Sequence, residues 1–139
     1  MYPSHLPLSG KRQTAKINNT IMKTIVKFTE MQKAAMVSLL IEMINVDGIV
    51  DPSECEVFDT ICVEYGIDEE TYSLGKSLNC LVAVEMMKRM NDRQKIAIAQ
   101  LLTRVIDADA KDDDKEIQLL NVICTATGVD ILINAADEQ

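Results

Sequence analysis

Residues that commonly carry out chemistry are scarce in this chain. It has no tryptophan, a single histidine (His5), and only 4% aromatic residues. An aliphatic core of Leu, Ile, Val, Met and Ala suits helix packing better than a sheet. There is no glycine-rich phosphate loop and no nucleophile beside a base, so the sequence predicts that the protein is not an enzyme.

Long apolar runs and leader signals are missing as well. No uninterrupted apolar run approaches the ~20 residues that cross a bilayer. The start of the chain carries Pro3, Pro7 and Gly10, and its charges follow a short apolar patch, which does not fit a signal peptide. We therefore expect a cytoplasmic protein with a flexible tail at 1–10 and a single domain at 11–139.

The four cysteines have no paired spacing that would suit a metal or redox site. Two of them, Cys62 and Cys124, each follow an isoleucine and precede a glycine by four residues. We interpret all four as small buried hydrophobic residues, the other two being Cys55 and Cys80.

Charge is distributed unevenly along the chain. Residues 1–28 contain five basic residues and no acid, whereas residues 29–139 contain nine basic and 22 acidic residues, a net charge of -13. This acidic body argues against nucleic-acid binding, which needs a basic face. It is compatible with cations or with basic protein partners.

The basic N-terminal region also has apolar residues at helical spacing, from about Lys11 to Phe28. Its stripe of Ile17, Ile21 and Ile25 has two interpretations. It either docks on the rest of the protein, or belongs to an amphipathic segment that contacts membrane or an acidic partner. The candidate contact residues on the opposite face are Arg12, Lys16, Lys23 and Lys27.

The chain contains an internal repeat. Residues 29–68 match residues 91–130 at an offset of 62, with thirteen of forty pairs identical. Such a self-match predicts one supersecondary unit used twice. The first members of the identical pairs are Gln32, Lys33, Ala35, Leu39, Leu40, Ile44, Asp47, Asp51, Glu54, Ile61, Cys62, Gly66 and Asp68.

Each copy of the repeat is predicted to be a helical hairpin. Its first helix, near 30–46 or 92–108, is apolar almost all round and belongs at the centre of a bundle. A capping box precedes each of these helices. The boxes are Thr29 with Gln32 and Asn91 with Gln94.

The second helices are expected near 52–65 and 114–127. Asp51 and Pro52 form a start signal for the first of them, and a glycine ends each one, Gly66 and Gly128. Residues 69–90 add one or two helices and a short one near 130–136 closes the chain. The predicted fold is all-α, a compact bundle of six or seven helices built from two pseudo-twofold helical-hairpin repeats.

Acidic residues gather in the loop between the paired helices of each repeat. Asp51 and Asp113 fit as helix N-caps, but Asp47 and Asp109 sit at the unfavourable end of a helix dipole. Three interpretations stay open: capping networks alone, a site for Ca²⁺, Mg²⁺ or Mn²⁺, or a contact with a basic partner. The candidate residues are Asp47, Asp51, Glu54, Asp107, Asp109, Asp113 and Glu116.

The first loop, Asp47-Gly48-Ile49-Val50-Asp51-Pro52-Ser53-Glu54 followed by Gly66, resembles the TerB-like family of tellurite-resistance proteins. The second copy, Asp109-Ala110 with Asp113, Glu116 and Gly128, departs from the family at Ala110, where the family has glycine. The resemblance covers about residues 15–135.

This resemblance implies a compact helical bundle of two such units with no established enzymatic activity. It also implies a role in bacterial resistance to tellurite and other stress. The expected partners are proteins, namely other tellurite-resistance or membrane-associated proteins. The matching acidic residues then become a candidate surface for a cation or a partner.

Overall fold

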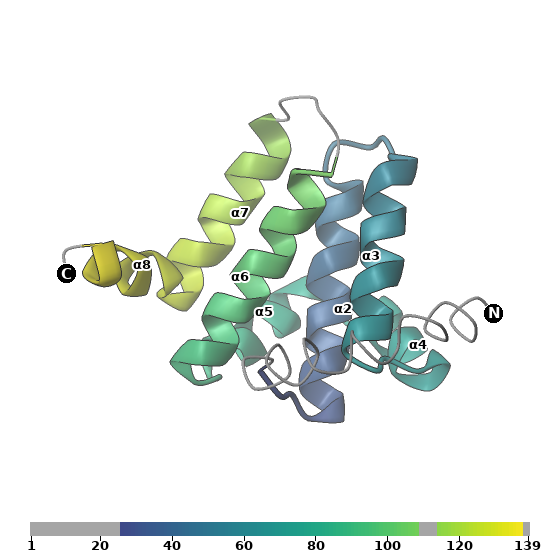
Figure 1. Ribbon diagram of the computed structural model, residues 1–139, viewed down its shortest axis with the longest axis horizontal. Helices are drawn as coiled ribbons and strands as arrows, with labels where there is room; N and C mark the ends of the chain where they lie inside the picture. Colours follow the sequence, from purple (N-terminus) through teal and green to yellow (C-terminus); the bar gives the residue numbers. More distant parts are fainter. Residues whose placement is uncertain (1–25, 109–113, 138–139) are drawn as a thin grey trace, which may run out of the picture.

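The computed structural model describes residues 26–108 and 114–137 (Figure 1). Within these ranges the protein has seven α-helices and no strand, which confirms the predicted all-α bundle. No described helix is long and apolar enough to span a membrane. The helices are α2 (Glu30–Asn45), α3 (Pro52–Glu64), α4 (Glu69–Ser77), α5 (Cys80–Lys88), α6 (Asp92–Ile106), α7 (Asp114–Thr127) and α8 (Val129–Asp137).

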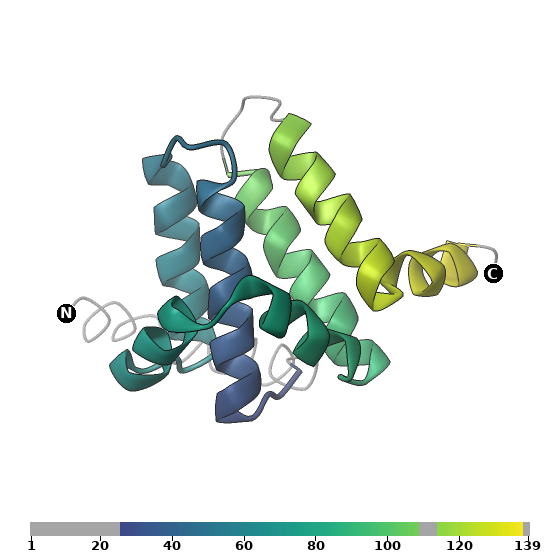
Figure 2. The same cartoon turned by 180° about the vertical axis from the view of Figure 1, so that it is seen from behind.

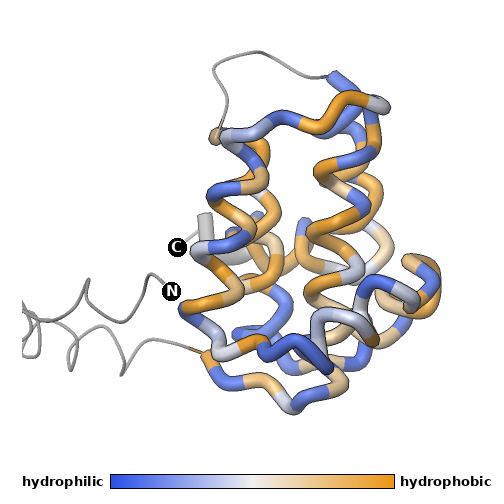
Figure 3. The backbone as a smooth tube through the Cα atoms, turned by 90° about the vertical axis from the view of Figure 1, so that its right-hand side faces the viewer, coloured by the Kyte–Doolittle hydropathy of each residue, from blue (hydrophilic) through white to orange (hydrophobic). Residues whose placement is uncertain are grey.

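The first helices of the two repeats, α2 and α6, pack against each other at the centre of the bundle, as predicted. Every residue of α2 from Ala34 to Leu40 is buried, because α4, α5 and α6 all pack on this helix. Figure 2, the view from behind, shows α4 and α5 crossing in front of α2. Figure 3 shows apolar residues recurring along the helices, and the buried core includes residues of α2, α3, α5, α6, α7 and α8.

The capping boxes at the start of α2 and α6 are both formed, and they meet. Each N-cap side chain accepts a hydrogen bond from the glutamine amide, and each glutamine side chain accepts one from the N-cap amide. The side-chain nitrogen of Gln94 also donates to Oε1 of Gln32 over 3.1 Å. These glutamines are equivalent in the repeat, so the two repeats contact each other through matching residues.

The ends of the hairpins follow the predicted glycines. Gly66 has a φ of +62°, a region that glycine enters without steric cost. Its amide donates to the carbonyl of Val63, and the amide of Ile67 donates to that of Cys62. This pair of bonds is a Schellman motif, which satisfies the last carbonyls of α3. Gly128 also has a positive φ, +87°.

The helix predicted from Lys11 to Phe28 needs a correction at its end. Val26, Lys27 and Phe28 are not helical. The chain must be extended at Thr29 (φ -73°, ψ 169°) for this residue to cap α2. The rest of that predicted helix and the tail at 1–10 lie outside the described residues.

Candidate functional site

The acidic loops connect helix ends that gather at one end of the molecule. In Figures 1 and 2 the C-terminal ends of α2 and α6 and the N-terminal ends of α3 and α7 all lie at the top. Five of the seven candidate acidic residues are described there. Asp109 and Asp113, the other two, lie outside the described residues.

The loop between α2 and α3 is held by its own aspartates. Asp51 caps α3 as predicted, because its Oδ1 accepts a hydrogen bond of 2.8 Å from the amide of Ser53. Asp47 accepts one of 3.0 Å from the amide of Ile49, two residues ahead. This bond of Asp47 is made within the loop rather than to α3, and both aspartates interact with further groups. These local bonds offset part of the cost of a carboxylate beside the end of α2.

Glu54 and Glu116 are the least expected members of the site. They occupy equivalent positions in the first turns of α3 and α7, and each is only 1% exposed. Sequence reasoning treated them as first-turn acids that favour a helix dipole, which is a role that exposed side chains fill equally well. Burial of an ionised carboxylate costs several kcal/mol unless other groups compensate its charge. Both residues interact with other groups, and the repeat brings two buried carboxyl groups to one end of the bundle.

Asp107 lies at the C-cap of α6 and is exposed. Its amide donates to the carbonyl of Thr103 over 2.9 Å, which closes the last turn of that helix. Among residues 26–108 and 114–137, no three His, Cys, Asp or Glu side chains are grouped so that they could hold a metal ion. The cation interpretation stays a prediction that also involves Asp109 and Asp113.

An apolar groove of about 230 Å³ begins beside the first acidic loop. Sequence reasoning did not identify it, although Ile49 and Val50 are apolar loop residues that stay 68% and 55% exposed. Such residues in a polar loop are the signal that could have indicated it. The groove is lined by Ile41, Ile44, Asn45, Val50, Cys55, Phe58, Tyr72 and Lys76.

The cysteines are free thiols and are half-buried, close to the prediction of small buried hydrophobic residues. Burial, together with the nearby charge of Asp59, raises the pKa of Cys62 to about 11. Burial also raises the pKa of Cys124, its repeat equivalent. Both thiols therefore stay protonated near neutral pH, where a protonated thiol is a poor nucleophile and a poor metal ligand.

At the opposite end of the bundle, the described part of the basic segment contacts both repeats. The carbonyl of Lys27 accepts a hydrogen bond of 2.9 Å from the side-chain nitrogen of Gln94 on α6. The ring of Phe28 packs edge-on against Tyr65, with centroids 5.7 Å apart. Lys27 is exposed. The other candidate contact residues, Arg12, Lys16 and Lys23, lie outside the described residues.

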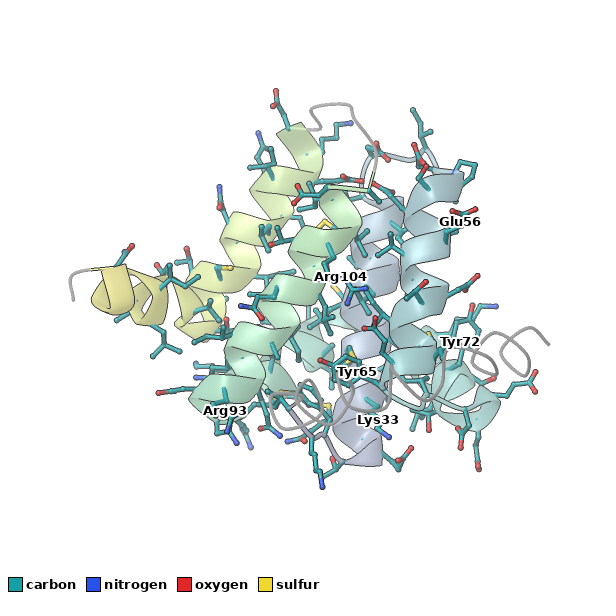
Figure 4. All side chains as sticks on the ribbon, in the orientation of Figure 1. Lys33, Glu56, Tyr65, Tyr72, Arg93 and Arg104 are labelled. Carbon is teal, nitrogen blue, oxygen red and sulfur yellow. The ribbon has the colours of Figure 1, made fainter. Side chains whose placement is uncertain are left out.

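An ion pair between Arg104 and Glu64 links the repeats and was not predicted. Arg104 on α6 donates to both carboxylate oxygens of Glu64 on α3, over 2.9 and 3.3 Å. Arg104 and Tyr65 lie on the face seen in Figure 4. The pair stabilises the contact between α3 and α6, but both side chains are about 40% exposed, so water screens it.

The fold and the site define a small all-helical bundle of two repeats with an acidic end. Comparison with solved structures finds a similar protein of unknown function, PG1108 from Porphyromonas gingivalis W83. It is 25% identical, the TM-score is 0.64, and the match covers 75% of this chain and 87% of that one. No family model matches the chain, and comparison with curated proteins gives no match.

Proposed function

We propose that the protein is a non-enzymatic, cytoplasmic stress-response module similar to the TerB-like proteins. It acts by binding protein partners, and its acidic end holds a divalent cation, Ca²⁺, Mg²⁺ or Mn²⁺. The observation that carries this proposal is the burial of Glu54 and Glu116 at equivalent positions of the two repeats. The family assignment rests on the duplicated loop pattern, Asp47-Gly48 with Asp51 and Glu54 in the first copy.

Hard divalent cations are bound by carboxylate and carbonyl oxygens. The two loops supply such oxygens at equivalent positions of the two repeats, and the acidic body attracts cations. Such an ion also offsets the mutual repulsion of the carboxylates gathered at this end, which explains why so many are present. In this proposal Asp47, Asp51 and Glu54 provide the oxygen ligands for the cation in the first loop.

In the second loop the matching residues are Asp109, Asp113 and Glu116, with Asp107 beside them. A protein partner then recognises either the acidic end with its bound cation or the apolar groove that begins at Val50. The thiols of Cys62 and Cys124 have raised pKa values, so they are poor nucleophiles near neutral pH, which is consistent with a binding role.

A titration with Ca²⁺ and, separately, Mn²⁺ tests the cation. We expect backbone amide signals of residues 45–54 and 107–116 to shift and the melting temperature to rise. An ion at about 100 times its Kd stabilises the folded state by about 2.7 kcal/mol. Glu54→Gln combined with Glu116→Gln should abolish the response, and so should Asp109→Asn combined with Asp113→Asn.

The matched control for the glutamate pair is Glu56→Gln with Glu85→Gln. It also removes two negative charges, but at exposed positions, and should leave the response to the ion intact. If millimolar ion shifts no signal in the wild-type protein, the cation part of the proposal is wrong. If the control loses the response as fully as the site variant, the ions bind the acidic surface without a specific site.

A second candidate is a structural or regulatory adaptor that uses the basic N-terminal segment. The hydrogen bonds of Asp47 and Asp51 favour it, because they show that part of the acidic loop serves as capping. In this role Arg12, Lys16, Lys23 and Lys27 contact membrane or an acidic partner. It predicts that replacing these four residues by Gln abolishes binding to vesicles containing phosphatidylserine, while the melting temperature stays the same.

A further inference from the structure

The apolar groove beside the first acidic loop is lined by residues of α2, α3 and α4. Ile41 and Ile44 come from α2, Phe58 comes from α3, and Tyr72 comes from α4. The rings of Phe58 and Tyr72 pack against each other with centroids 6.0 Å apart, so an aromatic contact holds this part of the lining in place. A mostly apolar lining with few polar groups is typical of sites that bind the apolar body of a small molecule.

Lys76 is the one charged side chain in the lining of the groove. Its ammonium lies 5.8 Å from the centroid of the Tyr72 ring, which is a cation–π distance. Within the described part of the chain, no carboxylate forms an ion pair with Lys76, in contrast to Lys33 and Arg104. Residues 29–139 have a net charge of -13, so the groove places a positive charge without a carboxylate partner beside an apolar lining. This charge complements an anionic group on an apolar ligand.

The volume of the groove limits the size of that ligand. At about 30 Å³ for each group of the size of a water molecule, the 230 Å³ of the groove hold roughly seven or eight such groups. Pockets for drug-sized molecules begin at about 300 Å³. The groove therefore suits a short, narrow ligand with one charged end.

We propose that this groove binds a small aliphatic monocarboxylate, a fatty acid of roughly eight carbons. Its carboxylate accepts a charge-assisted hydrogen bond from the ammonium of Lys76, and its tail packs on the apolar lining. The inference does not rest on the proposed cation, because the described lining contains none of the candidate acidic residues. With the groove occupied by this ligand, a protein partner recognises the acidic end instead.

A titration of the full chain with sodium octanoate, followed by the backbone amide signals, tests the site. The amides of Val50, Cys55 and Tyr72 should shift, with a Kd on the order of 1 mM for a ligand of this size. From butanoate to octanoate, each added methylene should lower the Kd by up to about fourfold, and this gain should stop once the groove is filled. Octan-1-ol has the same tail without the charge and should bind about three- to fivefold more weakly, since Lys76 is exposed and water screens its charge.

Two variants with matched controls separate the charge from the apolar lining. Lys76→Gln should raise the Kd of octanoate about three- to fivefold and leave that of octan-1-ol unchanged. Its control is Lys88→Gln, an exposed lysine outside the groove, which should leave both unchanged. Val50→Asp places a negative charge at the groove and should weaken octanoate binding. Its control is Val63→Asp, because Val63 has the same exposed fraction of 55% but does not line the groove.

Three results would overturn the inference. The first is that millimolar octanoate shifts none of the groove amides in the wild-type protein. The second is that octan-1-ol binds as tightly as octanoate and Lys76→Gln changes neither, since the groove would then be a general apolar surface of the kind that side chains of a protein partner cover. The third is that affinity keeps rising with tail length beyond decanoate while Val50→Asp and Val63→Asp behave alike, which is partition onto the protein surface rather than binding in the groove.

Discussion

Gly75 lies where α4 crosses α2, and the two backbones come closest there. A Cβ atom added to Gly75 would lie 2.6 Å from the carbonyl oxygen of Ala34 and 2.6 Å from Cβ of Val37. Atoms of these kinds do not approach so closely in folded proteins, and neither neighbour can rotate away. Replacement of Gly75 by alanine should therefore push α4 off α2.

Two opposing effects set the size of the change. Alanine is about 1 kcal/mol better than glycine inside a helix, whereas overpacking a tight contact costs about 1–3 kcal/mol. Displacement of α4 also strains the 3.0 Å hydrogen bond from Ser38 Oγ to the carbonyl of Leu78, which follows α4. Its loss costs about another 1 kcal/mol. We expect Gly75→Ala to lower the free energy of unfolding by about 1–3 kcal/mol.

Urea unfolding followed by circular dichroism measures this difference. Ser73→Ala is the control, because Ser73 is exposed in the same helix and gains helix propensity without a new contact. We expect the control to match or slightly exceed the stability of the wild type. If Gly75→Ala also equals or exceeds the wild type, the close crossing of α4 and α2 is not present in solution and the reasoning is refuted.

Three further predictions concern individual side chains. Removing the ion pair by Arg104→Ala or Glu64→Ala should cost no more than about 1 kcal/mol, and a double-mutant cycle in rising salt should show the coupling shrink. Cys62, with its pKa raised to about 11, should react with iodoacetamide at pH 8 at least about tenfold slower than an unfolded-state thiol, as followed by mass spectrometry. Its folded-state pKa exceeds the ordinary 9.0, so its contribution to stability should be lost as pH rises from about 9 to 11. Hydrogen bonds from Thr71 lower the pKa of Asp68 below 3.8. Its titration followed by NMR should therefore have a lower midpoint than that of a free aspartate. The stabilising effect of Asp68 should disappear only as the pH falls through that midpoint.

Local sequence signals predicted the helices well because their causes are local. The capping boxes opened by Thr29 and Asn91 start α2 and α6 at the predicted residues. Gly66 ends α3 because only a residue free of the Cβ clash enters the left-handed region cheaply. The predicted end at Phe28 was wrong because periodicity continues past the point where the chain becomes extended to form the next cap.

Contacts between distant residues were beyond the reach of such signals. Nothing near Gly75 in the sequence shows that α2 crosses at that residue, and the pair of Arg104 with Glu64 joins residues forty positions apart. The repeat itself did predict that α2 and α6 would meet, because two copies of one unit bury their apolar faces against each other. Which equivalent residues meet was visible only in the structure, at Gln32 and Gln94.

In the acidic loops, too, some features follow from the local sequence and others depend on the tertiary structure. The sequence by itself determined the composition of the loops, their duplication and the capping role of Asp51, because an N-cap needs only its own next residues. Only the tertiary structure decided that Glu54 and Glu116 are buried. An acid in the first turn of a helix favours the helix dipole whether it faces water or protein, so its sequence position carries no information about burial. The packing of α3 and α7 on the central helices turns both carboxylates inward.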